Sequence, residues 1–391
     1  MSQLESSPLL LIPGPTPVPQ PVLEALARPT ESHSSAATAG ALRQIQNGLL
    51  QAVGAAPEQE ALALVLAGSG TLGLEAALAN LLGPGETLLV VNHGYFGDRF
   101  AEVGRALGAE VVEVWCPWGQ QVDPARVEEA LRQSGATVMT VTHVDTATGV
   151  VAPFADYARI ARQRGALLVL DSVAGAGGMP VEMGANGIDV VVTASQKALG
   201  APPGLALLAI SNAALERRRA LGRCHGYFLD WLRWEAPMRD SSGRYFATLP
   251  TNLIAAGGAA LQVAGAEGWE ARFARHRRMG RATRQALRSL GLPPLAAEEV
   301  SSATVTAFAL PDGVTPAALR GEVAREGVAI AGGIGAWADR AGRLGHMGAA
   351  GLPELLRGVA ALEAALSRLG QPGEPGRGVT ALLRAWAGDP D

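Results

Sequence analysis

The sequence almost lacks lysine: 31 of its 32 basic residues are arginine, and Lys197 is the single lysine. Arginine can replace lysine wherever a solvated positive charge is enough, but its guanidinium stays protonated and is not a nucleophile. A lysine amine can lose its proton and form a Schiff base with a carbonyl. A chance surface lysine is the alternative. However, Lys197 lies between an apolar run and a Gly/Pro-rich loop, where α/β enzymes place their chemistry.

Cysteine and long apolar runs are also scarce. Cys116 and Cys224 form neither a disulfide framework nor a metal-binding pattern, which is typical of a reducing cytoplasm. The first eight residues do not resemble an export signal, and no run of about 18 apolar residues predicts a membrane span. We therefore expect a soluble cytoplasmic protein without a metal site and without a membrane partner.

Charge is sparse and slightly negative. Charged residues make up 17% of the chain, the net charge is −4 and the pI is near 5.9, which argues against a nucleic-acid partner. We interpret the short arginine clusters, Arg217–Arg219 and Arg275, Arg277 and Arg278, as solvated helix faces. Apolar residues make up 48% of 391 residues, enough for a large core. This length favours one large domain and one smaller domain.

Apolar runs alternate with helical segments from about residue 22. Such alternation predicts an α/β fold with a mostly parallel sheet covered on both faces, whose ligands bind beyond the carboxyl ends of the strands. The expected strands are 63–66, 87–91, 110–115, 137–142, 167–170, 190–193 and 205–210, and helices at 73–82, 100–107, 124–133 and 154–164 lie between them.

The two ends of the chain differ from this pattern. Residues 1–19 are proline-rich and should form an extended arm. Beyond about residue 260 the strands become fewer and shorter, and a long Arg-rich helix is expected at 269–290. We divide the chain into an arm (1–19), a large domain (20–262), a small α+β domain (263–369), and a linker with a tail (370–391).

The surroundings of the lysine resemble a known family. Ser195-Gln196-Lys197, followed by Gly204-Leu205-Ala206, resembles the pyridoxal 5'-phosphate attachment motif of class V aminotransferases, and within them the alanine/serine–glyoxylate group. The resemblance spans residues 9–369. It implies a fold-type-I homodimer with a seven-stranded sheet in the large domain. Lys197 would hold the cofactor as an internal aldimine and then act as general base and acid.

A glycine-rich turn precedes the first predicted helix of the sheet region. Gly-Ser-Gly-Thr at 68–71 lies between a strand and a helix, where backbone N–H groups and the helix N-terminus favour an anion. A simple turn would give the same pattern. With the resemblance, Ser69, Gly70, Thr71 and Gln196 are the expected contacts of the cofactor phosphate.

Asp171 ends a very apolar strand. It could be a helix cap. In pyridoxal-phosphate chemistry, a carboxylate at this place keeps the pyridine nitrogen protonated, so that the ring accepts electrons from the substrate. The resemblance also implies that Val173 and Phe96 cover the two faces of the ring and that Thr146 hydrogen-bonds its phenolic oxygen.

Two further sets of residues match the family. Arg343, in Arg-Leu-Gly-His-Met-Gly, matches the arginine that binds the substrate carboxylate, and Gly14, in Pro-Gly-Pro, borders the substrate. Tyr245 and Thr248 match a pair that reaches the phosphate from the neighbouring subunit. The predicted reaction moves an amino group from alanine or serine to a 2-oxo acid such as glyoxylate or pyruvate.

Other functions fit parts of this pattern. A pyridoxamine–pyruvate transaminase would share the fold, but it would not need the phosphate cup. A cysteine desulfurase is disfavoured because no cysteine follows Cys224. Residues 68–73 match the Gly-x-Gly-x-x-Gly spacing of a nicotinamide oxidoreductase, but the next strand ends in Asn92-His93 without a carboxylate. That last reading also leaves the single lysine unexplained.

Overall fold

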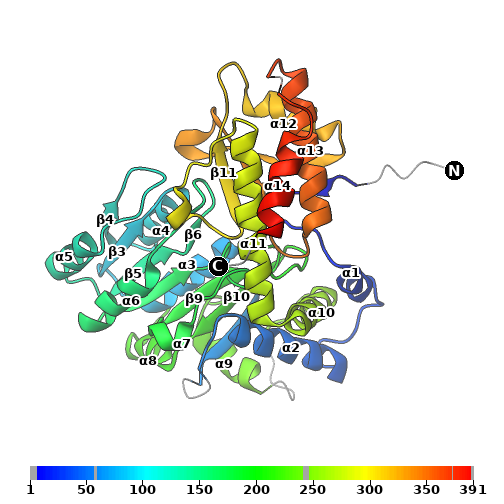
Figure 1. Cartoon of the computed structure of the whole chain (residues 1–391). Helices are drawn as coiled ribbons and strands as arrows, with labels where there is room; N and C mark the ends of the chain where they lie inside the picture. Colours follow the sequence, from blue (N-terminus) through cyan, green and yellow to red (C-terminus); the bar gives the residue numbers. More distant parts are fainter. Residues whose placement is uncertain (1–6, 57–59, 241–245, 372, 389–391) are drawn as a thin grey trace.

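A seven-stranded sheet forms the centre of the computed structural model, which describes residues 7–56, 60–240, 246–371 and 373–388 (Figure 1). The strand order is β2-β10-β9-β8-β5-β3-β4. The strands are β2 (Leu62–Ala67), β3 (Thr87–Asn92), β4 (Glu110–Trp115), β5 (Val138–Thr142), β8 (Leu167–Asp171), β9 (Val190–Ala194) and β10 (Leu205–Ile210). β10 is antiparallel to both neighbours and the other pairs are parallel. The predicted mostly parallel sheet is confirmed.

The composition of these strands explains why the sheet lies inside. β5, β9 and β10 consist mainly of Val, Leu, Ala and Thr and are buried at every position, so both faces of the sheet are covered. Helices that connect or flank the strands provide this cover (Figure 1). They are α3 (Gly70–Leu81), α4 (Tyr95–Ala106), α5 (Pro124–Ser134), α6 (Phe154–Gln163), α7 (Met183–Asn186), α8 (Asn212–Ala220) and α9 (Trp231–Arg239).

Six helices of the sheet-containing region were not among those predicted, and three of them are α7, α8 and α9. The others are α1 (Gln20–Leu26), α2 (Ala36–Ala52) and α10 (Thr251–Glu267), and α10 packs against both α1 and α2. α2 and α10 are rich in Ala and Gly, so they lack the sharp apolar stripe that reveals a helix in sequence. Pro21 lies in the first turn of α1, where no backbone N–H is needed, so this proline does not exclude a helix.

A second cluster of buried apolar side chains lies in the C-terminal part of the chain. Its elements are α11 (Trp269–Ser289), η2 (Glu298–Val300), β11 (Val305–Ala309), α12 (Pro316–Ala324), β12 (Val328–Ala329), β13 (Ala331–Gly332), η3 (Gly335–Trp337), β14 (Ala341–Gly345) and α13 (Leu352–Arg368). β11, β14 and β13 form an antiparallel sheet, and β1 (Leu9–Leu10) of the N-terminal arm pairs with β12. The domain boundaries proposed above stay a prediction.

The tail forms a docked helix. α14 (Arg377–Ala387) packs against α11 and α13, and its Leu382 is fully buried (Figure 1). The segment that the sequence analysis describes as a linker with a tail thus contains a helix of 11 residues. None of the helices in the described part of the chain is long and apolar enough to cross a membrane.

Candidate active site

A cavity of about 140 Å³ opens at the carboxyl edge of the sheet. β2, β3, β5, β8 and β9 all end at this edge, because β10 alone runs the other way. The lining residues are Ser69, Gly70, Thr71, Leu74, Phe96, Val144, Thr146, Asp171, Val173, Ala174, Gln196 and Lys197. The structure thus brings together nine residues that the sequence indicated. Leu74, Val144 and Ala174 were missed, since nothing but their position in space distinguishes them from core residues.

Lys197 follows β9 and reaches into this cavity. Its Nζ donates a hydrogen bond to the Pro13 carbonyl of the N-terminal arm. Burial lowers the pKa of Lys197 to about 8; the Asp171 carboxylate opposes this change and the Arg343 cation adds to it. A fraction of the amine is therefore unprotonated near neutral pH, as a nucleophile or a base requires.

The arm contacts the lysine at Gly14. A Cβ atom on Gly14 would lie 2.5 Å from Cδ and 2.8 Å from Nζ of Lys197, and the backbone φ of Gly14 is +109°. A side chain here would displace the lysine and strain the backbone. The structure therefore places Gly14 against the lysine.

Asp171 is the last residue of β8 and is buried, with 3% of its surface exposed. Among the described residues, its carboxylate accepts one hydrogen bond, from the N–H of Val173 at 2.9 Å. Burial raises the pKa of Asp171 to about 6, although the Val173 hydrogen bond and the Lys197 charge act against this change. The carboxylate keeps unused acceptor capacity toward the cavity that it lines.

Ser69 is the residue before α3, and Gly70 and Thr71 are the first two residues of this helix, so the three form the turn at its start. A Cβ on Gly70 would lie 2.9 Å from Cγ2 of Val173, so a larger residue would fill the space between the turn and the cavity wall. Gln196 lines the same cavity, and its buried Oε1 has no hydrogen-bond partner among the described residues. A buried amide without a partner indicates that a polar ligand completes it.

Phe96 is held by a residue that the sequence analysis did not select. Asp145 lies in the hairpin of β6 (Val144–Asp145) and β7 (Val150–Val151) and is fully buried. It accepts the N–H groups of Phe96 (3.2 Å), Ala147 (2.9 Å) and Thr148 (3.2 Å). Burial raises the pKa of Asp145 to about 6. Its position three residues after a predicted strand was the available signal, but its contact with Phe96 was not visible in sequence.

Arg343 reaches the site from β14. Its Nε donates to the Gly332 carbonyl (2.7 Å) and its Nη1 to the Thr146 carbonyl (3.3 Å). These contacts hold the guanidinium next to Thr146, a residue of the cavity wall. The positive charge of Arg343 also helps to lower the pKa of Lys197. No carboxylate of the described residues pairs with it, so its remaining N–H groups can bind an anion.

Together these groups suit a flat anionic ring: an amine with a lowered pKa, a buried carboxylate, apolar walls and a polar cradle. The family model described as aminotransferase class-V matches residues 9–337 of the chain. The chain belongs to the class V aminotransferases. It is therefore a fold-type-I transaminase that uses pyridoxal phosphate, and the resemblance seen in the sequence is confirmed.

Individual relatives of this aminotransferase carry several names. It is 35% identical over 366 residues to the "soluble hydrogenase, small subunit" of Synechococcus sp. (92% of this chain, 93% of that protein). It is 33% identical over 343 residues to the alanine–glyoxylate aminotransferase of Oryctolagus cuniculus (86% of each). The crystal structure of the ureidoglycine–glyoxylate aminotransferase of Bacillus subtilis gives a TM-score of 0.92 at 25% identity (99% of this chain, 100% of that chain).

Thr248, one of the two residues predicted to act across a subunit boundary, does not line the cavity of this aminotransferase chain. Thr248 lines a separate surface pocket with His33, Pro202 and Pro203. Tyr245 lies outside the described residues. The structure of one chain therefore leaves their assignment as a prediction.

Helix α11 connects the active-site loops of the aminotransferase. Arg272 donates to the carbonyls of Gly177 (2.8 Å) and Ala198, the residue after the lysine. His276 accepts the Gly348 N–H at 3.2 Å. Arg275 donates to the Gly348 carbonyl at 3.0 Å and pairs with a glutamate, so its interpretation as part of a solvated face was wrong. These contacts tie the lysine loop to the segment that follows Arg343.

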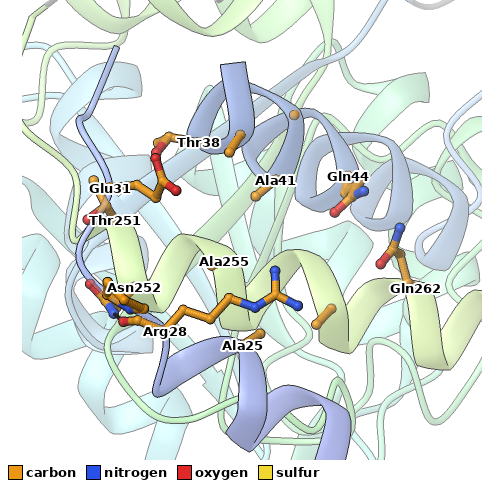
Figure 2. A pocket seen from close by; sticks show the side chains of 14 residues that line it. Ala25, Arg28, Glu31, Thr38, Ala41, Gln44, Thr251, Asn252, Ala255 and Gln262 are labelled. Atoms are coloured by element: carbon orange, nitrogen blue, oxygen red, sulfur yellow. Dashed lines mark hydrogen bonds between the residues drawn. The ribbon is translucent and has the colours of Figure 1, made fainter. Parts of the chain in front are cut away.

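A larger pocket, of about 370 Å³, lies between α1, α2 and α10 (Figure 2). Arg28, Glu31, Gln44 and Gln262 are among its lining side chains, and none of the predicted site residues that the structure describes lines it. The aminotransferase site is thus identified by its chemistry and not by its size. Within the described ranges, no three His, Cys, Asp or Glu side chains lie together as a metal ion would require.

Proposed function

We propose that this aminotransferase moves the amino group of a small amino acid, alanine or serine, to a 2-oxo acid such as glyoxylate or pyruvate. The observation that carries the proposal is the placement of the single lysine. Lys197 lies in the cavity with its pKa lowered to about 8, and both the Asp171 carboxylate and the Arg343 cation act on its charge. Family relatives named for glyoxylate support the choice of acceptor.

We assign the cofactor contacts as follows. Lys197 binds the aldehyde carbon and Asp171 faces the pyridine nitrogen, while Val173 and Phe96 cover the ring. The remaining contacts are Thr146 at the phenolic oxygen and Ser69, Gly70, Thr71 and Gln196 at the phosphate. When bound, pyridoxal phosphate supplies an electron sink for the bond that breaks at the substrate Cα. Two observations support this fit: the buried Oε1 of Gln196 has no hydrogen-bond partner among the described residues, and Gly70 leaves space where a side chain would lie.

Three residues of the chain have separate roles in the reaction. Arg343 binds the substrate carboxylate through its free N–H groups and so orients the Cα atom. Lys197 would take the proton from the substrate Cα through Nζ and would then donate it to the cofactor carbon that is bonded to the transferred nitrogen. Because Gly14 has no Cβ atom, it leaves the space that the Lys197 side chain needs while it transfers the proton.

We further propose a cytoplasmic homodimer whose active sites are shared. Tyr245 and Thr248 of one chain would reach the phosphate of the other, which agrees with the position of Thr248 outside its own cavity. Mixing Lys197→Ala with Thr248→Ala chains should restore about half of the wild-type activity per heterodimer, because one site then receives both intact parts. If heterodimers form and no activity returns, the trans assignment is wrong.

The test of the reaction is a visible spectrum followed by a substrate panel. The purified enzyme should show the absorption of a lysine-bound cofactor, and alanine or serine should transfer nitrogen to glyoxylate or pyruvate. A spectrum without that absorption would contradict the proposal. Turnover with unphosphorylated pyridoxamine and pyruvate, without pyridoxal phosphate, would favour the pyridoxamine–pyruvate reaction instead.

A further inference from the structure

Arg99, on α4, is a half-buried cation at the edge of the cofactor cavity. Its Nη1 donates to Oγ1 of Thr71 at 3.1 Å, and its Nη2 donates to the Tyr95 hydroxyl at 3.3 Å. It pairs with no carboxylate among the described residues, whereas Arg105 on the same helix forms an exposed ion pair with Glu113. A guanidinium held in this way has N–H groups and charge available for a ligand.

The same guanidinium also contacts the aromatic residues at the start of α4. Its Cζ lies 5.4 Å from the ring centres of both Tyr95 and Phe96, and the two rings are nearly perpendicular. The hydrogen bond to Thr71 and the ring contacts restrict the guanidinium from two sides. Arg99 therefore joins the turn at the start of α3 to the ring-covering residue Phe96.

The hydrogen bond to Thr71 has a direct consequence for that hydroxyl. A hydroxyl has one donor hydrogen and can accept with its lone pairs. Because Oγ1 of Thr71 accepts from Arg99, its own hydrogen is free to point to another acceptor. Among the described residues, no other cationic side chain bonds to Ser69, Gly70 or Thr71. Lys197 is committed to the aldehyde in the proposed function, so it cannot serve the phosphate.

We propose that Arg99 is a positioning residue for the cofactor phosphate: it directs the Thr71 hydroxyl toward the phosphate and adds a positive charge to the cup. This inference rests on the proposed function of residues 69–71. The Arg99 charge also acts on Asp171, because it is one of the influences that oppose the burial-driven rise in the pKa of that carboxyl group.

The test compares two ligands that differ in the phosphate alone. Apo-enzyme is titrated with pyridoxal phosphate and with pyridoxal, and the dissociation constants are measured from visible absorption. Arg99→Gln should weaken the binding of pyridoxal phosphate by roughly tenfold to a hundredfold, the range for loss of a charge-assisted hydrogen bond. Pyridoxal binding should change by less than about twofold, because this ligand has no phosphate for the guanidinium to support. Arg105→Gln, the control on the same helix, should change neither constant.

Two further variants separate the route through Thr71 from a general loss of structure. Thr71→Val should lower the preference for the phosphorylated ligand, and adding Arg99→Gln to it should lower that preference less than Arg99→Gln does alone. Arg99→Lys keeps a charge without the planar fork and should lose less than Arg99→Gln. It also provides a folded variant if the glutamine variant does not fold.

Three results would overturn the inference. Equal weakening of both ligands would mean that Arg99 supports the ring or the fold and not the phosphate. Unchanged binding of both ligands in a folded Arg99→Gln enzyme would remove its role altogether. Fully additive losses in the double variant would exclude the route through Thr71. A wild-type enzyme that develops no visible absorption with pyridoxal phosphate would instead overturn the proposed function itself.

Discussion

Two buried carboxylates lie near the same cavity and differ in what they bind. Asp171 and Asp145 are both almost without exposed surface, and burial raises the pKa of each to about 6. Asp145 accepts backbone N–H groups from Phe96, Ala147 and Thr148. Asp171 accepts one N–H among the described residues and lines the cavity.

The difference teaches which buried acid is available for chemistry. Burial and a raised pKa are common to both residues, so neither property alone identifies the functional one. Acceptor capacity that the protein leaves open does distinguish them, because an unfilled carboxylate in a closed site is costly unless a ligand completes it. We therefore propose that Asp171 serves the cofactor and that Asp145 holds the start of α4, which carries Phe96.

The most damaging change should be at Lys197, whose charge interacts with that of Asp171. Lys197→Arg keeps the positive charge but removes the amine that can bond to the cofactor. We expect a folded protein that lacks the visible absorption after dialysis, with turnover lower by on the order of 10⁴-fold or more. A Lys197→Arg enzyme that keeps its visible absorption and its activity would contradict the whole assignment of the site.

Asp171→Asn tests the cofactor role that we propose for Asp171. The amide cannot keep the pyridine nitrogen protonated, so the rate of proton removal should fall by roughly a hundredfold, or about 3 kcal/mol of barrier. The lysine-bound absorption should persist. If Asp171 is only a helix cap, the variant will keep its rate and lose about 1 kcal/mol of unfolding free energy.

Asp145→Asn tests the structural role that we propose for Asp145. One oxygen of Asp145 accepts from Phe96 and the other from Ala147 and Thr148, so an amide must turn an NH₂ group toward an N–H donor. We expect the unfolding free energy, measured with urea, to fall by about 1–3 kcal/mol, while kcat/KM falls by roughly tenfold or less. A rate loss as large as that of Asp171→Asn would erase the distinction between the two acids.

The sequence predicted much of this site because its residues follow strands that a simple pattern reveals. Lys197 and Asp171 end apolar runs, and parallel strands bring such ends to one edge. Asp145, Arg99 and Arg275 were not selected, since their roles depend on contacts with residues far away in sequence. Asp145 binds Phe96 49 positions away, and Arg275 binds Gly348 73 positions away. The pattern of a single segment contains no information about such partners.

The smallest expected effect concerns the stability of the apo-enzyme. The pKa of Asp171 is about 6 in the fold and 3.8 in an exposed aspartate, so the folded state binds more protons between these values. Stability therefore falls as the pH rises from about 4 to about 6, and the full cost of the buried charge remains above that window.

Asp171→Asn removes this titration, although Asp145 and Asp189, whose pKa values are also raised to about 6, still titrate. Relative to wild type, the apo variant should gain on the order of 2–3 kcal/mol between pH 4 and pH 7, measured by urea unfolding at each pH. A difference between the two proteins that does not change with pH would mean that the Asp171 carboxylate is already compensated in the apo-enzyme, and that its open acceptor capacity does not set it apart from Asp145.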